Sequence, residues 1–546
     1  MRSPTLLIAT TAAFFPAYAF QLPFNIKLPF FGGSQAPLAA PELPETATPN
    51  RIAIIGAGAA GSSAAYWLAK GKERYGLDVE VDVYDKNAYI GGRSTTVFPY
   101  DNEALEAVEL GASIFVKVNK NLWRAVDEFG LERVNFESDE DDIMGIWDGQ
   151  EFALTTGGGS FYSDWLNKIK IIWRYGYKAP TKTQALVKSM VERFLTLYSP
   201  HAPQWSNVSS VVSELGWADV TAQTAAEYFD LQGIDRRWTR ELVEAATRVN
   251  YGHNVDKIHA LEGLCSLAAT GASSVKGGNF QIFEHFLANS QASVYLNTTV
   301  KSISHYHPSG PWVVESTAFD QPRLYRAVIL AAPFHQAQIN FKASLAPVPE
   351  QPYVHLHVTL LSTSSPTPDP NYFNLAHGAK APTTLLTTYE GVRSRGGPEP
   401  EFNSLTYHGP VRDKEGVVQV NARGEKEWVV KIFSKDRIED EWLERLFGGN
   451  VGWVLRKEWD AYPVLPPTTE FPPVKLADGL YYVNAFEPLI STMETETIAA
   501  RNVADLLLKE HFNAGICNPA RHDENTERSD EEFVYGWDCP KVDVQL

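Results

Sequence analysis

The chain has 546 residues, and its 66 acidic residues outnumber its 48 basic ones to give a formal net charge of −18. The length predicts large hydrophobic cores and two interleaved domains. The charge argues against nucleic acid as a partner, because phosphate backbones call for a basic surface.

The first residues have the pattern of a secretory signal peptide at 1–19. Arg2 supplies one positive charge, residues 6–15 are an apolar run, and Ala17-Tyr18-Ala19 offers a small-residue cleavage site. We therefore expect the protein in the secretory pathway, either secreted or in a vacuolar or lysosomal lumen. The glycosylation sequons at Asn207 and Asn297 agree with that route. Residues 20–48, rich in Pro and Ala, are typical of a linker arm.

Residues 51–61, Arg-Ile-Ala-Ile-Ile-Gly-Ala-Gly-Ala-Ala-Gly, predict a buried strand followed by a phosphate-binding turn. In this spacing Gly56 permits the tight turn, and Gly58 lets the backbone approach a pyrophosphate. Gly61 lets the next helix pack closely against the strand. A tight turn in an unrelated α/β protein is the alternative interpretation.

The predicted helix begins with Ala59 and Ala60, and its free N–H groups and positive dipole end attract phosphate. The next predicted strand, residues 79–85, alternates in period two and ends on Asp85. An acid at this point is placed to hold the ribose hydroxyls of a dinucleotide. We assign Lys86, which follows directly, to the same site.

A second glycine pair, Gly91-Gly92, comes shortly after this strand and is followed by Arg93. The pair permits another close approach of backbone, and the guanidinium of Arg93 can pair with phosphate charge. A domain that binds only NAD has no need of such a second loop. These residues resemble the large family of FAD-dependent oxidases that includes the amine oxidases.

Further segments match the same resemblance at 325–333, 479–485 and 495–509. It implies that the segment 109–114 lies near the flavin ring, and we assign to the cofactor site Gly111, Ala112, Ser113 and, from a strand at 296–300, Val300. We expect FAD to be bound non-covalently, because no Cys or His stands in an obvious flavin-attachment context. A second G-x-G-x-x-G for NAD(P)H is missing from the sequence, which favours O2 as the electron acceptor.

The expected fold class is α/β, with a Rossmann-type FAD-binding domain interleaved with a mixed α+β substrate domain. The FAD-binding segments are placed at 49–119, 271–344 and 456–510. Between them lie a mostly helical substrate segment at 120–270 and a β-rich one at 345–455. Residues 511–546 form an acidic tail.

An apolar stripe recurs every four residues in the helical run that starts at 161, and it consists of Phe161, Trp165, Ile169 and Trp173. Such a stripe is typical of a core helix with a solvated opposite face. The alternative is a basic, aromatic helix near a pocket mouth or in peripheral contact with a membrane or lipid surface.

Histidines and cysteines offer few further sites. His355 and His357 share one face of the alternating run 354–358, where a solvated or structural role is favoured over catalysis. No Cys or His grouping has zinc-site spacing in the sequence, so no metal is predicted. Cys517 and Cys539 flank the polar tail, and we predict that they pair in an oxidising compartment. Cys265 lies in an apolar run and is expected to be a buried, free thiol.

One group of FAD oxidases resembles this chain over residues 50–510, namely the prenylcysteine oxidases, also called prenylcysteine lyases. The resemblance is carried by the segments 108–114, 247–256, 261–267 and 275–279. It implies a secretory flavoenzyme that cleaves the thioether of farnesyl- or geranylgeranyl-cysteine to cysteine, a prenyl aldehyde and H2O2. The partners would be a small prenylated thioether and O2.

The candidates for the substrate site and catalysis lie in the segment 247–256 and are Arg248, Asn250, Tyr251 and His253. Arg248 could pair with a substrate carboxylate, and a structural salt bridge is equally compatible with its position. Two rival functions keep the flavin. One is an oxidase that acts on an amine or tailors a terpenoid or other prenylated metabolite, and the other is a lipid-binding flavoprotein without turnover.

Overall fold

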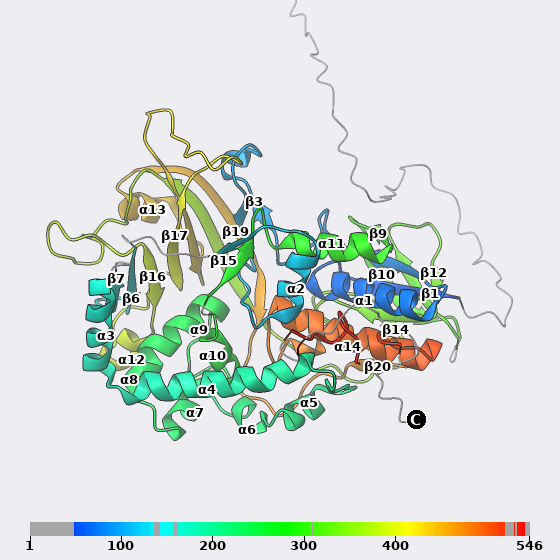
Figure 1. Cartoon of the computed structure of the whole chain (residues 1–546). Helices are drawn as coiled ribbons and strands as arrows, with labels where there is room; N and C mark the ends of the chain where they lie inside the picture. Colours follow the sequence, from blue (N-terminus) through cyan, green and yellow to red (C-terminus); the bar gives the residue numbers. More distant parts are fainter. Residues whose placement is uncertain are drawn as a thin grey trace, which may run out of the picture.

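The computed structural model describes residues 49–135, 142–157, 161–269, 271–307, 310–518, 529 and 532–540, with the backbone alone described for 161–165. The predicted signal peptide and arm, residues 1–48, lie outside this range. The described chain forms two lobes side by side, one around a mostly parallel sheet and one around a long mixed sheet (Figure 1). No helix in this part of the chain is both long and apolar enough to cross a lipid bilayer.

The first lobe is built on a six-stranded sheet with β1 (Arg51–Ile55) near its centre. Ile52, Ala53 and Ile54 are fully buried, as expected for a strand covered on both faces. The sheet has an antiparallel edge strand, β20, next to five parallel strands. Its order is β20 (Lys475–Ala477), β21 (Leu480–Tyr482), β13 (Ala327–Leu330), β1, β2 (Glu80–Tyr84), β9 (Ser293–Tyr295).

Helix α1 (Ala59–Tyr75) packs against α14 (Met493–Phe512) and α11 (Phe280–Ser290). The approach to α14 is close, because a Cβ on Gly71 would come within 2.4 Å of the Leu508 side chain. The fully buried Trp67 also ties these helices together, since its Nε1 donates to the carbonyl oxygen of Thr497 at 3.2 Å. A four-stranded sheet in the same lobe has the order β12 (Arg323–Tyr325), β11 (Trp312–Ser316), β10 (Val300–His305), β14 (Asn340–Lys342). This Rossmann-type lobe confirms the predicted α/β class.

The second lobe contains a seven-stranded sheet in which neighbours are antiparallel except for β16 and β6. Its order is β19 (Val451–Pro463), β15 (Tyr353–Thr363), β18 (Trp428–Ser434), β17 (Ser404–Pro410), β16 (Thr384–Thr387), β6 (Ile143–Trp147), β7 (Phe152–Gly157).

Most helices of this lobe lie below the sheet in Figure 1. They are α3 (Phe161–Tyr175), α4 (Lys178–Leu195), α5 (Val208–Glu214), α6 (Ala218–Thr221), α7 (Ala225–Leu231), α8 (Arg236–Trp238), α9 (Glu244–Tyr251) and α10 (Ala260–Ser266). The remaining helices and strands are α2 (Lys120–Glu128), α12 (Glu390–Arg395), α13 (Asp440–Phe447), and the two-stranded pairs β3 (Thr96–Val97) with β4 (Val108–Glu109) and β5 (Arg133–Asn135) with β8 (Ser273–Val275).

Some strands cross the segment boundaries expected from the sequence. β6 and β7 lie within the range 120–270, which was expected to be mostly helical, and β6 pairs with β16 from a distant part of the chain. β19 starts inside the range 345–455 and continues to Pro463, because it pairs along almost the whole length of β15. Long-range pairing of this kind sets strand ends that local composition does not show.

Helix α3 turns the described part of its apolar stripe outward. Ile169 is 42% exposed and Trp173 is 87% exposed, whereas Tyr175 is buried and Arg174 pairs with Glu241 at 2.7 Å. The core interpretation is therefore wrong at Ile169 and Trp173, because a stripe shows which residues share a face but not which face is covered. The side chains of Phe161 and Trp165 lie outside the described residues.

The disulfide between Cys517 and Cys539 confirms the predicted pairing, with 5.4 Å between their Cα atoms. Cys265 is free, as predicted, and is half-buried instead of fully buried. The residues before Cys539 pack on α1, where the Trp537 ring lies 5.1 Å from that of Tyr66. This part of the predicted tail is therefore attached to the first lobe, and most of the acidic stretch 523–532 lies outside the described residues.

Candidate active site

The turn after β1 contains glycines with two different functions. Gly56 has a φ of +112°, and a Cβ there would lie 2.3 Å from the carbonyl oxygen of Ala331. A Cβ on Gly61 would lie 1.8 Å from the carbonyl oxygen of Gly56. The packing of the turn itself therefore requires both glycines. A Cβ on Gly58, in contrast, would meet no described protein atom closer than 3.7 Å, so this glycine leaves space open beside the start of α1.

That space is suited to an anion. Within the described residues no side chain caps the N-terminus of α1, and its first turn carries no acidic residue. Free N–H groups at a helix start bind phosphate, with the helix dipole adding to the attraction. Asp85, at the end of β2, holds the turn in place by accepting from the N–H of Ala57 at 2.7 Å and of Asn87 at 2.8 Å. Burial raises the pKa of Asp85.

The second glycine loop lies against the first. The N–H of Gly91 donates to the carbonyl oxygen of Ala57 at 2.9 Å, and Gly91 forms a bridge with Gly58. Arg93 directs its guanidinium to Glu487 at 2.5 Å and to the carbonyl oxygen of Ala461 at 2.8 Å. A protein carboxylate thus balances the charge of Arg93, and its predicted contact with phosphate stays a prediction.

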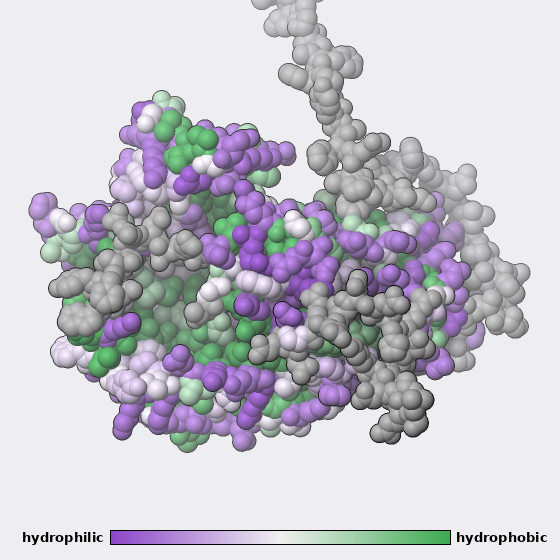
Figure 2. Space-filling model, viewed as in Figure 1, coloured by the Kyte–Doolittle hydropathy of each residue, from purple (hydrophilic) through white to green (hydrophobic). Residues whose placement is uncertain are grey.

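These loops open into a cavity of 810 Å³ that extends from the first lobe into the second. Every predicted cofactor residue except Gly61 lines it, namely Gly56, Gly58, Ala59, Ala60, Asp85, Lys86, Gly92, Arg93, Gly111, Ala112, Ser113 and Val300. Its far part is mainly apolar and is lined from the seven-stranded sheet and from α4, with Leu356, Val358, Phe433, Trp459 and Phe194 among the lining residues. Figure 2 shows hydrophobic residues gathered between that sheet and the helices below it. The volume falls in the range of small-molecule sites.

A buried lysine stands on the cavity wall where the two parts meet. Lys431, on β18, donates from Nζ to the carbonyl oxygen of Glu109 at 2.8 Å and to Oγ of Ser113 at 2.7 Å. Burial lowers the pKa of Lys431, and it raises the pKa of the neighbouring Glu109 carboxyl. The two pKa values therefore move toward neutrality, which is typical of groups that exchange protons at working pH.

Sequence reasoning missed Lys431. The pattern that could have revealed it is a single lysine inside the apolar run 428–433. Lys431 alternates there with Val429 and Phe433, so it shares their side of the strand. Only the pairing of β18 with β15 and β17 shows that this side is a cavity wall and not solvent.

The four candidates for the substrate site and catalysis are not all brought to the cavity. Tyr251 lines the cavity beside Asn250, and its ring lies 5.9 Å from that of Tyr462. Arg248 and His253 are buried but do not belong to the cavity lining found in the described chain. Gly252, with a φ of +66°, ends α9 directly before His253.

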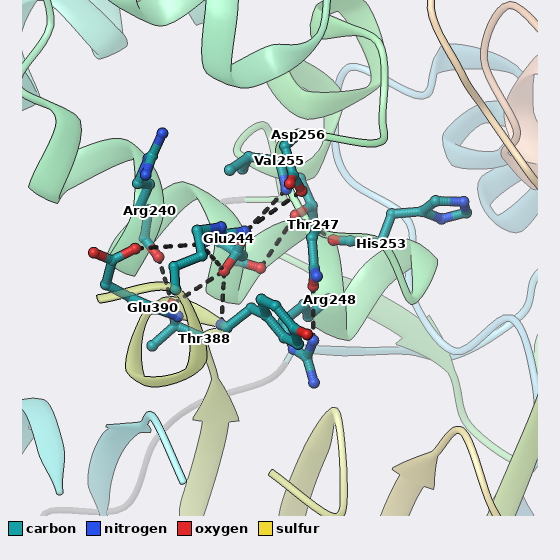
Figure 3. Close-up of polar contacts among 12 residues, drawn as sticks. Arg240, Glu244, Thr247, Arg248, His253, Val255, Asp256, Thr388 and Glu390 are labelled. Carbon is teal, nitrogen blue, oxygen red and sulfur yellow. Dashed lines mark hydrogen bonds and ion pairs between the residues drawn. The ribbon is translucent and has the colours of Figure 1, made fainter. Parts of the chain in front are cut away.

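Figure 3 shows Arg248 beside a network of polar contacts around Glu244, whereas the ring of His253 points away from that network. Arg248 donates to Oγ1 of Thr387 at 2.8 Å and to Oδ1 of Asn254 at 2.7 Å. The His253 Nδ1 lies 2.6 Å from the carbonyl oxygen of Tyr251, and burial lowers the pKa of His253. These contacts support the structural role of Arg248, and its contact with a substrate carboxylate stays a prediction.

The centre of the network is Glu244, a fully buried carboxylate at the start of α9. It accepts from the N–H of Tyr389 at 2.7 Å and of Val255 at 3.1 Å, and from both terminal nitrogens of Arg393. A buried charge is tolerated when it is paired and fully hydrogen-bonded. The distinctive segment 247–256 is thus explained in large part by the need to tie α9 to α12 and β16.

The cradle fits FAD as its cofactor. The anion site at α1, the second glycine loop and the segment 111–113 line one continuous cavity, which a dinucleotide with a ring at its far end would fill. Several buried polar atoms of residues on its wall have no partner among the described residues, namely Oδ1 of Asn484 and both carboxylate oxygens of Glu496. Buried polar atoms are rarely left unpaired, so these are the groups expected to contact a bound cofactor or its waters.

Two family models match the chain, one for prenylcysteine lyase over residues 161–516 and one for an NAD(P)-binding Rossmann-like domain over residues 54–129. The farnesylcysteine lyase of Arabidopsis thaliana is 28% identical over 478 residues, which cover 85% of this chain and 89% of that protein. Human prenylcysteine oxidase 1 is 28% identical over 515 residues, which cover 90% of this chain and 92% of that protein.

Among solved structures, a putrescine oxidase matches with a TM-score of 0.53 at 14% identity, covering 84% of this chain and 98% of that one. The cyclohexylamine oxidase of Brevibacterium oxydans IH-35A matches with a TM-score of 0.52 at 14% identity, covering 84% of this chain and 99% of that one. At this level of identity the structures show a shared fold and nothing more. The match of the prenylcysteine lyase model to well over half of the sequence shows that this chain belongs to the prenylcysteine lyase family.

Proposed function

We propose that the protein is a FAD-dependent oxidase that cleaves the thioether of farnesyl- or geranylgeranyl-cysteine. The observation that carries this proposal is the single cavity that joins a dinucleotide cradle to a mainly apolar chamber. The substrate class is supported by the family and by the names of the relatives, farnesylcysteine lyase and prenylcysteine oxidase.

When bound, FAD would supply the acceptor for a hydride from the allylic carbon beside sulfur, and the electrons would pass to O2 to give H2O2. Loss of the hydride leaves a carbon cation that is stabilised by sulfur and by the allylic double bond. Water adds to this carbon, and the resulting hemithioacetal breaks at the carbon–sulfur bond. One thioether, one O2 and one water thus give one prenyl aldehyde, one free cysteine and one H2O2.

The residues of this chain would hold and orient the substrate. Leu356, Val358 and Phe433 offer apolar walls to a prenyl chain, and the closed fit of Trp459 against Gly111 limits the entry of water. At the junction, Lys431 Nζ has a pKa lowered by burial. Its neutral form can accept a proton from the water that adds to the carbon.

The test is anaerobic mixing of the flavin-loaded protein with farnesylcysteine, followed by exposure to oxygen. Farnesylcysteine should bleach the flavin absorbance without added nicotinamide, and oxygen should restore the absorbance with release of H2O2. Cysteine and aldehyde should form in equal amounts, and deuterium at the allylic carbon should slow the bleaching. Bleaching by an amine or a terpenoid alcohol but not by farnesylcysteine would favour the rival oxidase. If none of these compounds bleaches the flavin, the lipid-binding flavoprotein is favoured instead.

We also propose that the cofactor is held without a covalent bond and that the protein enters the secretory pathway. Precipitation with acid should leave the yellow colour in the supernatant, and colour in the pellet would contradict the first point. Asn207 and Asn297 are both exposed. Enzymatic removal of N-glycans should therefore increase the gel mobility of the protein made in a eukaryotic secretory host, and unchanged mobility would count against the second.

Peripheral contact with a lipid surface is supported by α3. The outward side of this helix carries Ile169, Ile172 and Trp173, together with the exposed amines of Lys168 and Lys170. Aromatic and apolar residues beside basic ones favour binding to an anionic membrane surface. Trp173→Ser should weaken co-sedimentation with anionic vesicles, whereas Tyr306→Ser, at an exposed aromatic of the first lobe, should not. Equal binding by both variants would rule out α3 as the contact.

A further inference from the structure

Two histidines and two carboxylates face each other across the pair of strands β15 and β19. His355 is paired in register with Asp460, and His357 with Glu458. Alternate residues of a strand share one face, so all four side chains lie on the same side of the sheet. Leu356 lies between the two histidines on β15 and therefore takes the opposite side of the sheet, where it lines the cavity, which Asp460 also borders.

The contacts divide the four residues into ligands and a support. The Nδ1 of His355 lies 3.2 Å from Oδ1 of Asp460, and its Nε2 lies 3.7 Å from Oε2 of Glu458. The Nδ1 of His357 lies 3.7 Å from the same Glu458 oxygen. One ligand atom from each of His355, His357 and Glu458 falls within 4.8 Å of the other two. A hydrogen bond from Nδ1 of His355 to Asp460 leaves the lone pair of Nε2 directed at this group.

We propose that His355, His357 and Glu458 bind a divalent transition-metal ion, with Zn²⁺ as the ion that fits best, and that Asp460 orients His355. Zn²⁺ bonds of about 2.0–2.1 Å to nitrogen and oxygen in a tetrahedral site hold neighbouring ligands about 3.4 Å apart. The two 3.7 Å separations from Glu458 are close to that value. The two histidine nitrogens lie within 4.8 Å of each other, so metal binding would also draw the imidazoles together. Two neutral imidazoles and one carboxylate leave a fourth position for water or another ligand.

Charge favours a bound cation over an empty cluster. Two carboxylates border two imidazoles that are uncharged when they act as ligands, so a divalent ion would neutralise the group. Imidazole and carboxylate together suit zinc better than the oxygen-seeking Ca²⁺ or Mg²⁺. The sequence did not predict this site, because Glu458 and Asp460 are a hundred residues from the histidines along the chain.

A second cluster in the described chain gives a useful contrast. Asp478, Glu510 and His511 also approach one another, but the ammonium of Lys475 already lies 2.6 Å from Glu510 and 3.2 Å from Asp478. A lysine therefore occupies the place that a metal ion would take. His511 can serve as a matched control, since it is a histidine beside two carboxylates without the proposed function.

A metal ion at His355 and His357 would clamp β15 to β19 on the outer side of the cavity wall. These strands carry Leu356 and Trp459, which line the chamber on the inner side. The expected effect is therefore a rise in the melting temperature with added Zn²⁺, since binding to the folded state alone stabilises it. The proposal does not depend on which substrate the enzyme cleaves.

The experiment is calorimetric titration of the untagged, flavin-loaded full chain with Zn²⁺ alone, in a non-chelating buffer near neutral pH. We expect one Zn²⁺ per chain, with affinity reduced more than about tenfold in both His355→Gln and His357→Gln. Asp460→Asn should reduce affinity about 10- to 100-fold, as loss of a supporting carboxylate does. His511→Gln should bind like the wild type. Flavin content checks the folding of each variant.

Two results would overturn the proposal. The first is the lack of stoichiometric Zn²⁺ binding to the wild-type protein. The second is equal binding by the wild type, His355→Gln and His357→Gln, which would place the ion elsewhere. Loss of binding in the histidine variants with no effect of Asp460→Asn would keep the ligands but reject the role given to Asp460.

Discussion

Replacing Gly58 by valine tests the cofactor site without breaking the turn that carries it. Gly58 has extended backbone angles, φ −80° and ψ −164°, which valine adopts readily. Its new Cβ would meet no described protein atom closer than 3.7 Å, an ordinary contact. We therefore expect the free energy of unfolding of the cofactor-free protein to change by less than about 1 kcal/mol. The added side chain would instead occupy the space in which a phosphate meets the start of α1.

The cost to cofactor binding follows from the hydrogen bonds that the phosphate could no longer accept. A hydrogen bond to a charged group contributes about 1.5–3 kcal/mol, so displacement from two N–H groups costs about 3–6 kcal/mol. That corresponds to roughly 10²- to 10⁴-fold weaker binding of FAD. The assay is flavin absorbance per chain after desalting, together with thermal melting of variant and deflavinated wild type. The comparison must use deflavinated protein because bound cofactor itself raises the melting temperature.

Gly56→Ala is the matched control. A Cβ at this position would lie 2.3 Å from the carbonyl oxygen of Ala331, and the φ of +112° disfavours any side chain. This variant should lose stability outright and fail to fold or melt far earlier. Full flavin loading of Gly58→Val, or a melting temperature as low as that of Gly56→Ala, would refute the division of the glycines into packing and cofactor roles.

Three further predictions concern the tail, a buried histidine and the cavity lysine. Cys517→Ser should lower the free energy of unfolding in urea by about 3 kcal/mol, from the chain-entropy cost of a loop with a sequence separation of 22, and an unchanged midpoint would contradict this. Burial lowers the pKa of His259 to about 4. The fold holds His259 in its neutral form, so its contribution to the free energy of unfolding is complete above pH 6.5. The free energy of unfolding of the wild type should exceed that of His259→Asn, a variant that keeps a cap on α10, by an amount that shrinks by about 3 kcal/mol as the pH falls from 6.5 toward 4. A difference that does not change with pH would refute this. Lys431→Met should slow anaerobic flavin bleaching by farnesylcysteine about 10²- to 10⁴-fold with flavin content unchanged, and should remove the rise in rate with pH near neutrality. Wild-type rates in that variant would exclude the lysine as a proton acceptor.

All but one of the residues that local motifs assigned to the cofactor line the same cavity. The turn from Gly56 to Gly61 and the acid at Asp85 lie on consecutive elements, so their spacing alone fixes their geometry. The substrate end was harder, because its wall comes from strands far apart in the chain. Lys431 enters the cavity only through the pairing of β18 with its neighbours.

The distinctive segment 247–256 correctly indicated the family but not which of its residues line the cavity. Arg248 contacts Thr387, and the His253 ring contacts the carbonyl oxygen of Tyr251. Neither Arg248 nor His253 is among the residues that line the cavity in the described chain. A polar residue in a characteristic motif can satisfy a buried charge as readily as it can contact a substrate. The prediction that the apolar stripe of α3 is buried was wrong for a similar reason. Whether Trp173 is covered depends on the other elements that pack around α3, which the sequence of α3 does not show.

The interleaving of the first lobe constrains how the protein can be synthesised. β1 pairs with β13, β13 pairs with β21, and α14 packs on α1. The parts needed to close the cradle thus arrive from both ends of the chain, and a nascent chain lacks the last of them until residues near Phe512 have left the ribosome. The cofactor would therefore be acquired only after α14 has been synthesised. A fragment that ends before α14 would leave the buried face of α1 uncovered and would be a substrate for chaperones or proteases instead of a small flavoprotein.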